Sequence, residues 1–485
     1  MEGIGLQMKK GLVWTAIDKY SNFFISLAIS MVLARLLPPH DFGVVATATV
    51  LLAFLTMMAN FGIGPAIIQR KDLSQSDLDN IFSFTILVGL VLGGISFISS
   101  WPISCFYDNP ELKPVVQVLS VGLFLTCINV VPSALMSKNL RFREMATRSV
   151  AFNLIFGIIG IIAAFYGAGV YALICPQIIS SFFTFLYNNH FQPVRLSGHF
   201  TLDPIKRIFS YSFYVLLTNF TTYLNRNLDK LIIGKALSAD SLGYYDKSYR
   251  LMQMPMTYVS SVITPVMQPV LSSLQNNMTE MSNKYKKIIS LIASLSFPIA
   301  AILFFSAEDL IFVFYGENWL PAVESFKILA LSVPVVLISS PNGSMFMACN
   351  ATKQLFICSI IGTSIFATSM AVAALMGDSI ESFAWAVTVN EFIGICISYY
   401  ILFARVMRQS IISILKVLSL PVVSLLILIL IYLLYSLVVP ISLPHIIHLF
   451  LKLSIGGLFI LSYLKVTHQF DIIEFIRNKF NINKR

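Results

Sequence analysis

Residues 80–103 read NIFSFTILVGLVLGGISFISSWPI, a run of 24 residues without a charged side chain. A helix rises 1.5 Å per residue, so this stretch is longer than the roughly 30 Å hydrocarbon core of a bilayer. Thirteen further stretches of comparable length and apolarity lie on either side of it. The expected membrane spans are 10–37, 41–64, 80–103, 114–136, 149–167, 169–189, 208–236, 244–274, 288–306, 325–348, 355–376, 382–404, 413–437 and 445–465.

Lys and Arg alternate in step with these spans. With the N-terminus placed in the cytoplasm, only four of the 33 basic residues fall on outward loops, namely Arg35, Lys113, Lys235 and Lys247. Six lie within spans, and the others collect on the inward loops and the two tails. This bias follows the positive-inside rule. The sequence therefore predicts an all-α polytopic membrane protein with about 14 transmembrane helices and both termini cytoplasmic.

Composition excludes several classes of protein. With 57% hydrophobic and 12% charged residues, the chain does not fit a soluble globular class. The net charge of +10 lies mostly on inward rims, so it reports topology, and we expect no nucleic-acid partner. No nucleotide-binding, zinc or catalytic motif is present, so we expect neither enzyme nor metal site. The four tryptophans lie near span ends, where we expect membrane interfaces: Trp14, Trp101, Trp319 and Trp385.

An internal echo predicts two repeats. Residues 34–43 (ARLLPPHDFG) and 234–243 (GKALSADSLG) share basic, Leu and Gly positions at an offset of 200, and each follows a span entered from a basic end. Parallel repeats with the substrate path between them are a common transporter plan. We therefore expect an N-terminal lobe over 1–205 and a C-terminal lobe over 206–410, each of six helices. Residues 411–485 would add two extra helices and a basic tail.

Polar side chains within spans are costly and usually face a bundle interior or a wet cavity. The seventh span carries a stripe at spacings of four, three and four: Asn219, Tyr223, Arg226 and Lys230. Two like charges one turn apart are destabilising unless an anion neutralises them. Asp229 can pair with Arg226, but Lys230 is then left over. This pattern favours an anion-binding site.

Other spans carry further candidates. The first span carries Asp18, Lys19 and Asn22, and the eighth carries Arg250 and Gln253 in its first turns. The alternatives are that Asp18 with Lys19 and Arg226 with Asp229 form structural pairs, and that Arg250 extends to the interface. We interpret Lys327 and Lys452, near outer ends, as snorkelling to water. Glu391 in mid-span suggests either coupling to Na⁺ or H⁺ or an interhelical hydrogen bond, and Asp18 is a second coupling candidate.

Several of these segments resemble one family. They are 61–70 (FGIGPAIIQR), 140–143 (LRFR), 227–235 (NLDKLIIGK), 242–245 (LGYY) and 316–319 (GENW). Together they resemble the polysaccharide transporter branch of the multidrug/oligosaccharidyl-lipid/polysaccharide flippase superfamily, of the type that exports colanic and teichuronic acid. The resemblance covers about residues 5–405, and no motif in the last two spans matches.

The resemblance implies two six-helix lobes around a cationic cavity in a bacterial inner membrane. The substrate would be an undecaprenyl-diphosphate-linked oligosaccharide repeat unit, moved to the periplasmic leaflet by alternating access. Partners would be membrane lipids, a polysaccharide polymerase and a chain-length regulator, with no cofactor beyond a coupling ion. The substrate-binding side chains would be the span residues named above, with Arg226, Lys230, Arg250 and Lys19 on the diphosphate.

Two rival functions remain open. An ion-coupled multidrug antiporter of the same superfamily would favour acidic cavity residues for cationic drugs, whereas the stripe in the seventh span is basic. A membrane polysaccharide polymerase or ligase would need a sizeable outer loop with catalytic groups. The outer loops here are short and acidic.

Overall fold

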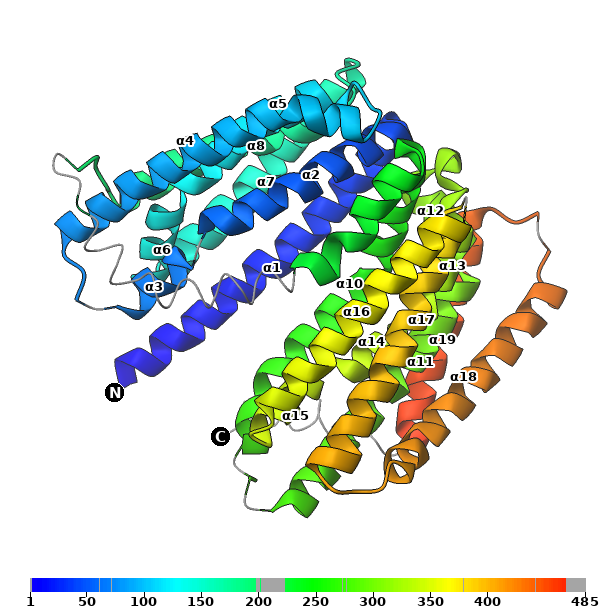
Figure 1. Ribbon diagram of the computed structural model, residues 1–485. Helices are drawn as coiled ribbons and strands as arrows, with labels where there is room; N and C mark the ends of the chain where they lie inside the picture. The colour runs from blue at the N-terminus through cyan, green and yellow to red at the C-terminus, as the bar shows by residue number, and fades with distance from the viewer. Residues whose placement is uncertain are drawn as a thin grey trace, which may run out of the picture. The chain divides into compact units, whose positions relative to one another are not determined.

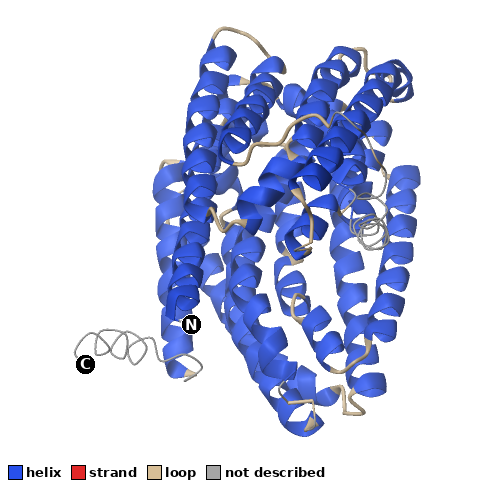
Figure 2. Ribbon diagram, turned by 90° about the vertical axis from the view of Figure 1, so that its left-hand side faces the viewer, coloured by secondary structure: helices blue, strands red, loops and turns tan. Residues whose placement is uncertain are grey.

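The computed structural model describes the backbone of residues 2–60, 62–70, 72–197, 201, 223–272, 274–275, 277–377, 379–440 and 442–467. It describes the side chains of the same residues except 2–10, 60, 258–266 and 268–270. In this part of the chain the regular structure is helical throughout, and no strand is present (Figure 2). The prediction of an all-α fold is confirmed for the described residues.

The chain divides into two compact units, 1–243 and 244–485. The helices of the first unit are α1 (Glu2–Leu36), α2 (Pro39–Asn60), α3 (Ile63–Gln69), α4 (Gln75–Phe106), α5 (Leu112–Ile128), α6 (Val130–Lys138), α7 (Phe142–Phe165) and α8 (Tyr171–Phe191) (Figure 1). Residues 223–236 form a further helix of this unit. The helix α10 (Ala239–Ser272) follows and crosses the boundary between the units.

The second unit contains the remaining helices. They are α11 (Met278–Phe305), α12 (Ala307–Tyr315), the 3₁₀ turn Glu317–Trp319, α13 (Ala322–Ala330), α14 (Val333–Ser339), α15 (Asn342–Ala348), α16 (Thr352–Met376), α17 (Ile380–Tyr399), its π-helical continuation Tyr400–Val406, α18 (Ile412–Val438) and α19 (His445–Val466). Within this unit α18 and α19 both pack on α11. The boundary at 243/244 comes from contacts within the fold. The repeat-based division of the chain at 205/206 stays a prediction.

Ten helices of the described part of the chain are long and apolar enough to cross a membrane. The bent pair Ala322–Ala330 and Val333–Ala348, at 42° to each other, would make an eleventh span. Two helices that coincide with predicted spans, α8 and α10, are not among them. Part of the predicted span 208–236 lies outside the described residues. The count of 14 spans and the side on which the termini lie therefore stay predictions.

Local sequence explains where several helices begin and break. Ser74 caps α4: its hydroxyl accepts from the Asp77 amide, and the Asp77 carboxylate accepts from the Ser74 amide at 3.0 Å. This reciprocal capping box satisfies two amides that have no partner inside the helix. Within the predicted span 114–136, Asn129 separates α5 from α6, and the two helices together form one candidate span, Leu112–Lys138.

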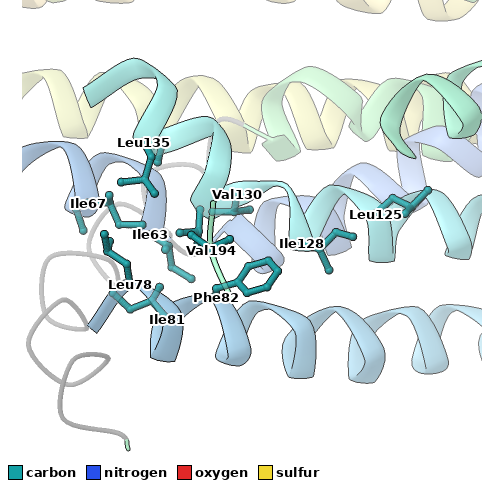
Figure 3. Close-up of a cluster of buried hydrophobic side chains, with 13 residues drawn as sticks. Ile63, Ile67, Leu78, Ile81, Phe82, Leu125, Ile128, Val130, Leu135 and Val194 are labelled. Carbon is teal, nitrogen blue, oxygen red and sulfur yellow. The ribbon is translucent and has the colours of Figure 1, made fainter. Parts of the chain in front are cut away.

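An apolar cluster ties this break to the short helix α3. Ile63 and Ile67 of α3 pack with Ile81 of α4 and Val131 of α6, and all four are at most 2% exposed (Figure 3). Such burial is stabilising at roughly 25 cal/mol per Å² of apolar surface where the alternative is water. Figure 3 shows Val194, from the segment after α8, reaching into the same cluster. The cluster fixes one end of the first unit.

The two echoed segments meet each other inside the first unit. A Cβ on Gly43 would lie 1.7 Å from the carbonyl oxygen of Ala239, and a Cβ on Gly243 would lie 2.2 Å from that of Pro39. Residues 39 and 239 correspond at the offset of 200, as do 43 and 243, so the two contacts are reciprocal. His40 Nδ1 lies 3.4 Å from Asp240 Oδ2, again between corresponding positions. Reciprocal pairing of this kind is what a two-fold axis produces.

One expectation about outer-end residues is wrong. Lys452 does not snorkel to water: its Nζ donates to Asp309 Oδ2 at 2.6 Å and to the Phe305 carbonyl at 2.9 Å. A carboxylate inside the protein, Asp309, takes the place of water as its partner. Trp319 is fully buried against other protein side chains, and its place at a membrane interface stays a prediction. Lys327 pairs with the exposed Glu324 at 2.7 Å.

Candidate functional site

The helix over 223–236 carries the basic pair predicted for the seventh span. Arg226 is exposed, Lys230 is half-buried, and Asp229 is only 1% exposed. Arg226 makes no hydrogen bond or ion pair with any residue that the structure describes, and the alternative in which Asp229 neutralises it is therefore not observed. An arginine remains charged under all ordinary conditions. Its guanidinium is available to an anion.

Tyr223 belongs to the same predicted stripe but lies in a different environment. Its hydroxyl donates to the carbonyl of Val50 in α2 at 2.7 Å, and its ring contacts Phe54 at a centroid distance of 5.7 Å. Tyr223 therefore anchors the helix to α2 and does not accompany Arg226 at the exposed face. Asn219 lies outside the described residues.

The polar residues of α1 join a network with α7. Asn22 Nδ2 donates to Asp18 Oδ1 at 2.7 Å and to Ser149 Oγ at 2.9 Å. Asn153 Nδ2 donates to Asn22 Oδ1 at 2.8 Å and to Ser26 Oγ at 2.9 Å. Hydrogen bonds between membrane helices hold them together in a medium without water. Lys19, beside this network, is half-buried.

Sequence reasoning missed the α7 side of this network. The signal was present, because Ser149 and Asn153 have the same i,i+4 spacing as Asp18 and Asn22. A second polar group continues from it: Arg148 bonds to Asn188 Oδ1, and Asn188 Nδ2 donates to Ser133 Oγ at 2.9 Å. The charge count includes Arg148 among the inward residues. Its bond to Asn188 shows that it also contributes to the interior of the first unit.

In the second unit, Arg250 is held by an acid that the sequence analysis did not single out. Arg250 Nε donates to Asp246 Oδ2 at 2.7 Å. Asp246 and Lys247 are each 4% exposed, whereas the Arg250 side chain is 61% exposed. Gln253, one turn further along α10, is half-buried.

Glu391 lies in the middle of α17 and is half-buried. No described residue makes a hydrogen bond or ion pair with it, so the alternative of an interhelical hydrogen bond is not observed. The side-chain oxygen of the adjacent Asn390 is buried and also lacks a hydrogen-bond partner within the described residues. The Glu391 carboxylate could take a proton or a small cation. Elsewhere in the described residues, no group of three or more His, Cys, Asp or Glu side chains could hold a metal ion.

A cavity of about 730 Å³ lies within the second unit between α11, α14, α17 and α18. Its lining is apolar apart from Cys396 and Thr388, and the Thr388 hydroxyl is already bonded to the Ile328 carbonyl at 3.0 Å. The cavity therefore contains no group that would bind a charged headgroup. The candidate anion-binding residues are Arg226 and Lys230 in the first unit and Arg250 in the second.

Sequence comparison matches the chain to a protein family and to related bacterial proteins. A family model described as "Polysaccharide biosynthesis protein" matches residues 32–324. The chain is 26% identical over 471 residues to an uncharacterized membrane protein in the cps region of Klebsiella pneumoniae, covering 94% of both chains. It is 24% identical to the lipopolysaccharide biosynthesis protein WzxC of Escherichia coli, covering 82% of both chains.

Structural comparison gives the fold. The lipid II flippase MurJ in an inward closed conformation superposes with a TM-score of 0.74 at 15% identity, covering 94% of this chain and 99% of the other. An inward-facing multidrug resistance transporter of the MATE family gives a TM-score of 0.63 at 14% identity, covering 84% and 99%. With its apolar helices, the molecule is a multi-pass membrane protein of this fold.

Proposed function

Since the chain belongs to the polysaccharide biosynthesis protein family, we propose that it is a transporter that flips a lipid-linked oligosaccharide across the bacterial cytoplasmic membrane. The substrate is an undecaprenyl-diphosphate-linked repeat unit, moved from the cytoplasmic to the periplasmic leaflet for surface polysaccharide biosynthesis. Names of the relatives support this proposal, because they include lipopolysaccharide and teichuronic acid biosynthesis proteins. In this proposal both termini lie in the cytoplasm, as the distribution of Lys and Arg predicts.

The observation that carries the proposal is Arg226, an exposed guanidinium without a described partner on a helix of the predicted seventh span. A charge in an apolar medium costs several kcal/mol unless it is paired. Lys230 lies one turn further on, and the two cations match the charge of a diphosphate. Arg226 can bind two phosphate oxygens at once, while Lys230 supplies a point charge.

Energy for the transport is proposed to come from an ion gradient. Glu391 and Asp18 are the candidate coupling residues, for Na⁺ or H⁺. Of the two, Glu391 has the better support, because Asp18 already accepts a hydrogen bond from Asn22 at 2.7 Å. Export measured with a Na⁺ gradient alone and with an H⁺ gradient alone would identify the coupling ion.

The test is complementation of surface-polysaccharide export with membrane protein level measured alongside. Arg226→Ala/Lys230→Ala should abolish export while the protein accumulates normally. Arg226→Lys should retain part of the export, because the charge remains but the planar fork of N–H donors of the guanidinium is lost. Arg195→Ala, which removes an exposed arginine from the segment after α8, is the matched control and should export normally. Full export by the double variant would refute the proposal.

A further inference from the structure

The first turns of α10 in the second unit are held rigidly. Three consecutive polar residues, Asp246, Lys247 and Ser248, are 4%, 4% and 1% exposed. The Ser248 hydroxyl donates to the carbonyl of Ala322 at 3.0 Å and lies 3.1 Å from the Ser325 hydroxyl. These bonds fix both the position and the rotation of α10 against the start of α13.

Lys247 adds a second fixed point. Its ammonium lies 5.1 Å from the ring centre of Tyr315 and 5.7 Å from that of Trp319. Burial raises the pKa of the Tyr315 hydroxyl, so the ring is a neutral phenol and the contact is a cation–π interaction. Trp319 also meets Tyr244 edge to face at 5.9 Å, which holds the same turn of the helix.

Arg250 projects from this fixed turn. Asp246 binds only its Nε, at 2.7 Å, and no other described residue makes a hydrogen bond to the guanidinium. Its two terminal amino groups are therefore unoccupied within the described part of the chain, and the side chain is 61% exposed. A guanidinium held at Nε keeps its opposite edge in one orientation, and that edge offers two parallel N–H donors.

We propose that Asp246 is a positioning residue that presents the terminal amino groups of Arg250 to the phosphate oxygens of an anionic lipid headgroup. The buried carboxylate fixes the direction of the fork, and the anchored α10 fixes the carboxylate. Arg250 thus loses little rotational freedom on binding, which is how a preorganised donor gains affinity. The assignment of the headgroup to a transported lipid rests on the proposed function, but the coupling between Asp246 and Arg250 does not.

A purely structural role for Asp246 predicts a loss of stability that does not depend on the residue at position 250. Asp246 also lies close enough to Lys247 for their charges to attract each other. If neutralising Lys247 were its only role, Asp246→Asn would strand a buried ammonium and lower stability whatever residue stands at 250. If Asp246 orients Arg250, the effect of Asp246→Asn on anion binding should depend on an arginine being present at position 250.

The experiment is a double-mutant cycle on the purified full-length protein, with inorganic pyrophosphate as the probe and binding measured by calorimetry. Arg250→Lys and Asp246→Asn should each weaken binding about ten-fold, and the double variant should be no weaker than Arg250→Lys alone, because lysine has no fork to orient. Asp246→Glu, which keeps the carboxylate, should restore part of the affinity. Multiplicative losses in the double variant, or a wild type that does not bind pyrophosphate, would overturn the inference.

Stability is measured in parallel. Asp309→Asn removes a comparably buried carboxylate, 4% exposed and bonded to Lys452, and serves as the structural control. It should lower the melting temperature and leave pyrophosphate affinity unchanged. Should Asp246→Asn fail to accumulate, Asp246→Asn/Lys247→Gln removes both buried charges and carries the same test. If export survives loss of Arg226 and Lys230 but the cycle still shows coupling, the proposed function fails and this inference stands.

Discussion

Replacing Gly43 by alanine should disrupt the crossing of the two echoed segments. The new Cβ would lie 1.7 Å from the Ala239 carbonyl oxygen, and real Cβ contacts are essentially never closer than 3.0 Å. The obstacle is a backbone atom, so no side-chain rotation relieves it and the two segments must separate. Overpacking of this kind costs about 1–3 kcal/mol, and we expect the upper end of that range. Gly243→Ala, with its Cβ 2.2 Å from the Pro39 carbonyl oxygen, should cost less.

The assay is thermal unfolding of the purified variants together with glycan export. Gly94 is the matched control, because it lies inside α4 and its Cβ would meet nothing within 4 Å. Gly94→Ala should be neutral or stabilising by about 0.5–1 kcal/mol, as expected for a helix interior. Equal stability and export of Gly43→Ala and Gly94→Ala would show that the close approach of the two segments is not a property of the molecule.

Three further outcomes are expected. Asn22→Ala should lower the free energy of unfolding by about 0.6–1.7 kcal/mol, the range for hydrogen bonds between membrane helices, and an unchanged melting temperature would contradict the α1–α7 network. Asp309→Asn should cost about 3 kcal/mol by leaving Lys452 without its counter-charge, and a second substitution, Lys452→Met, should restore most of it in the same assay. Cysteine-accessibility labelling should find position 286 (Lys286) in the cytoplasm and position 317 (Glu317) outside, and labelling of both from one side would reject the predicted topology.

Apolar length was enough to predict most of the helices. Long runs such as 80–103 coincide with single helices, because in a bilayer every backbone amide must be bonded within the segment. The same reasoning predicted one span over 114–136, which coincides with the candidate span Leu112–Lys138, but not the local turn at Asn129 inside it, since a short interruption leaves mean hydropathy unchanged. The echo at offset 200 was visible as three coincident residue types. That the two segments touch could not be read from it, because proximity depends on the packing of whole helices.

Prediction of the site was less complete. The charges within the predicted spans identified Arg226 and Lys230 as two cations with only one carboxylate, Asp229, nearby. The structure leaves Arg226 without a described partner. The same rule did not find Asp246, because its partner lies one helical turn away and the pair reads as an ordinary exposed i,i+4 contact. Tyr223 was grouped with Arg226 by spacing alone. A three-residue step is not enough to keep both on one face when α2 packs beside the helix.

The bond between Lys452 and Asp309 makes α12 depend on α19. A carboxylate that is 4% exposed is tolerated only with a cation beside it, and here the cation comes from α19. In a related chain that ends before α18, the residue at the start of α12 should be neutral, and grafting an aspartate there should impair insertion or accumulation.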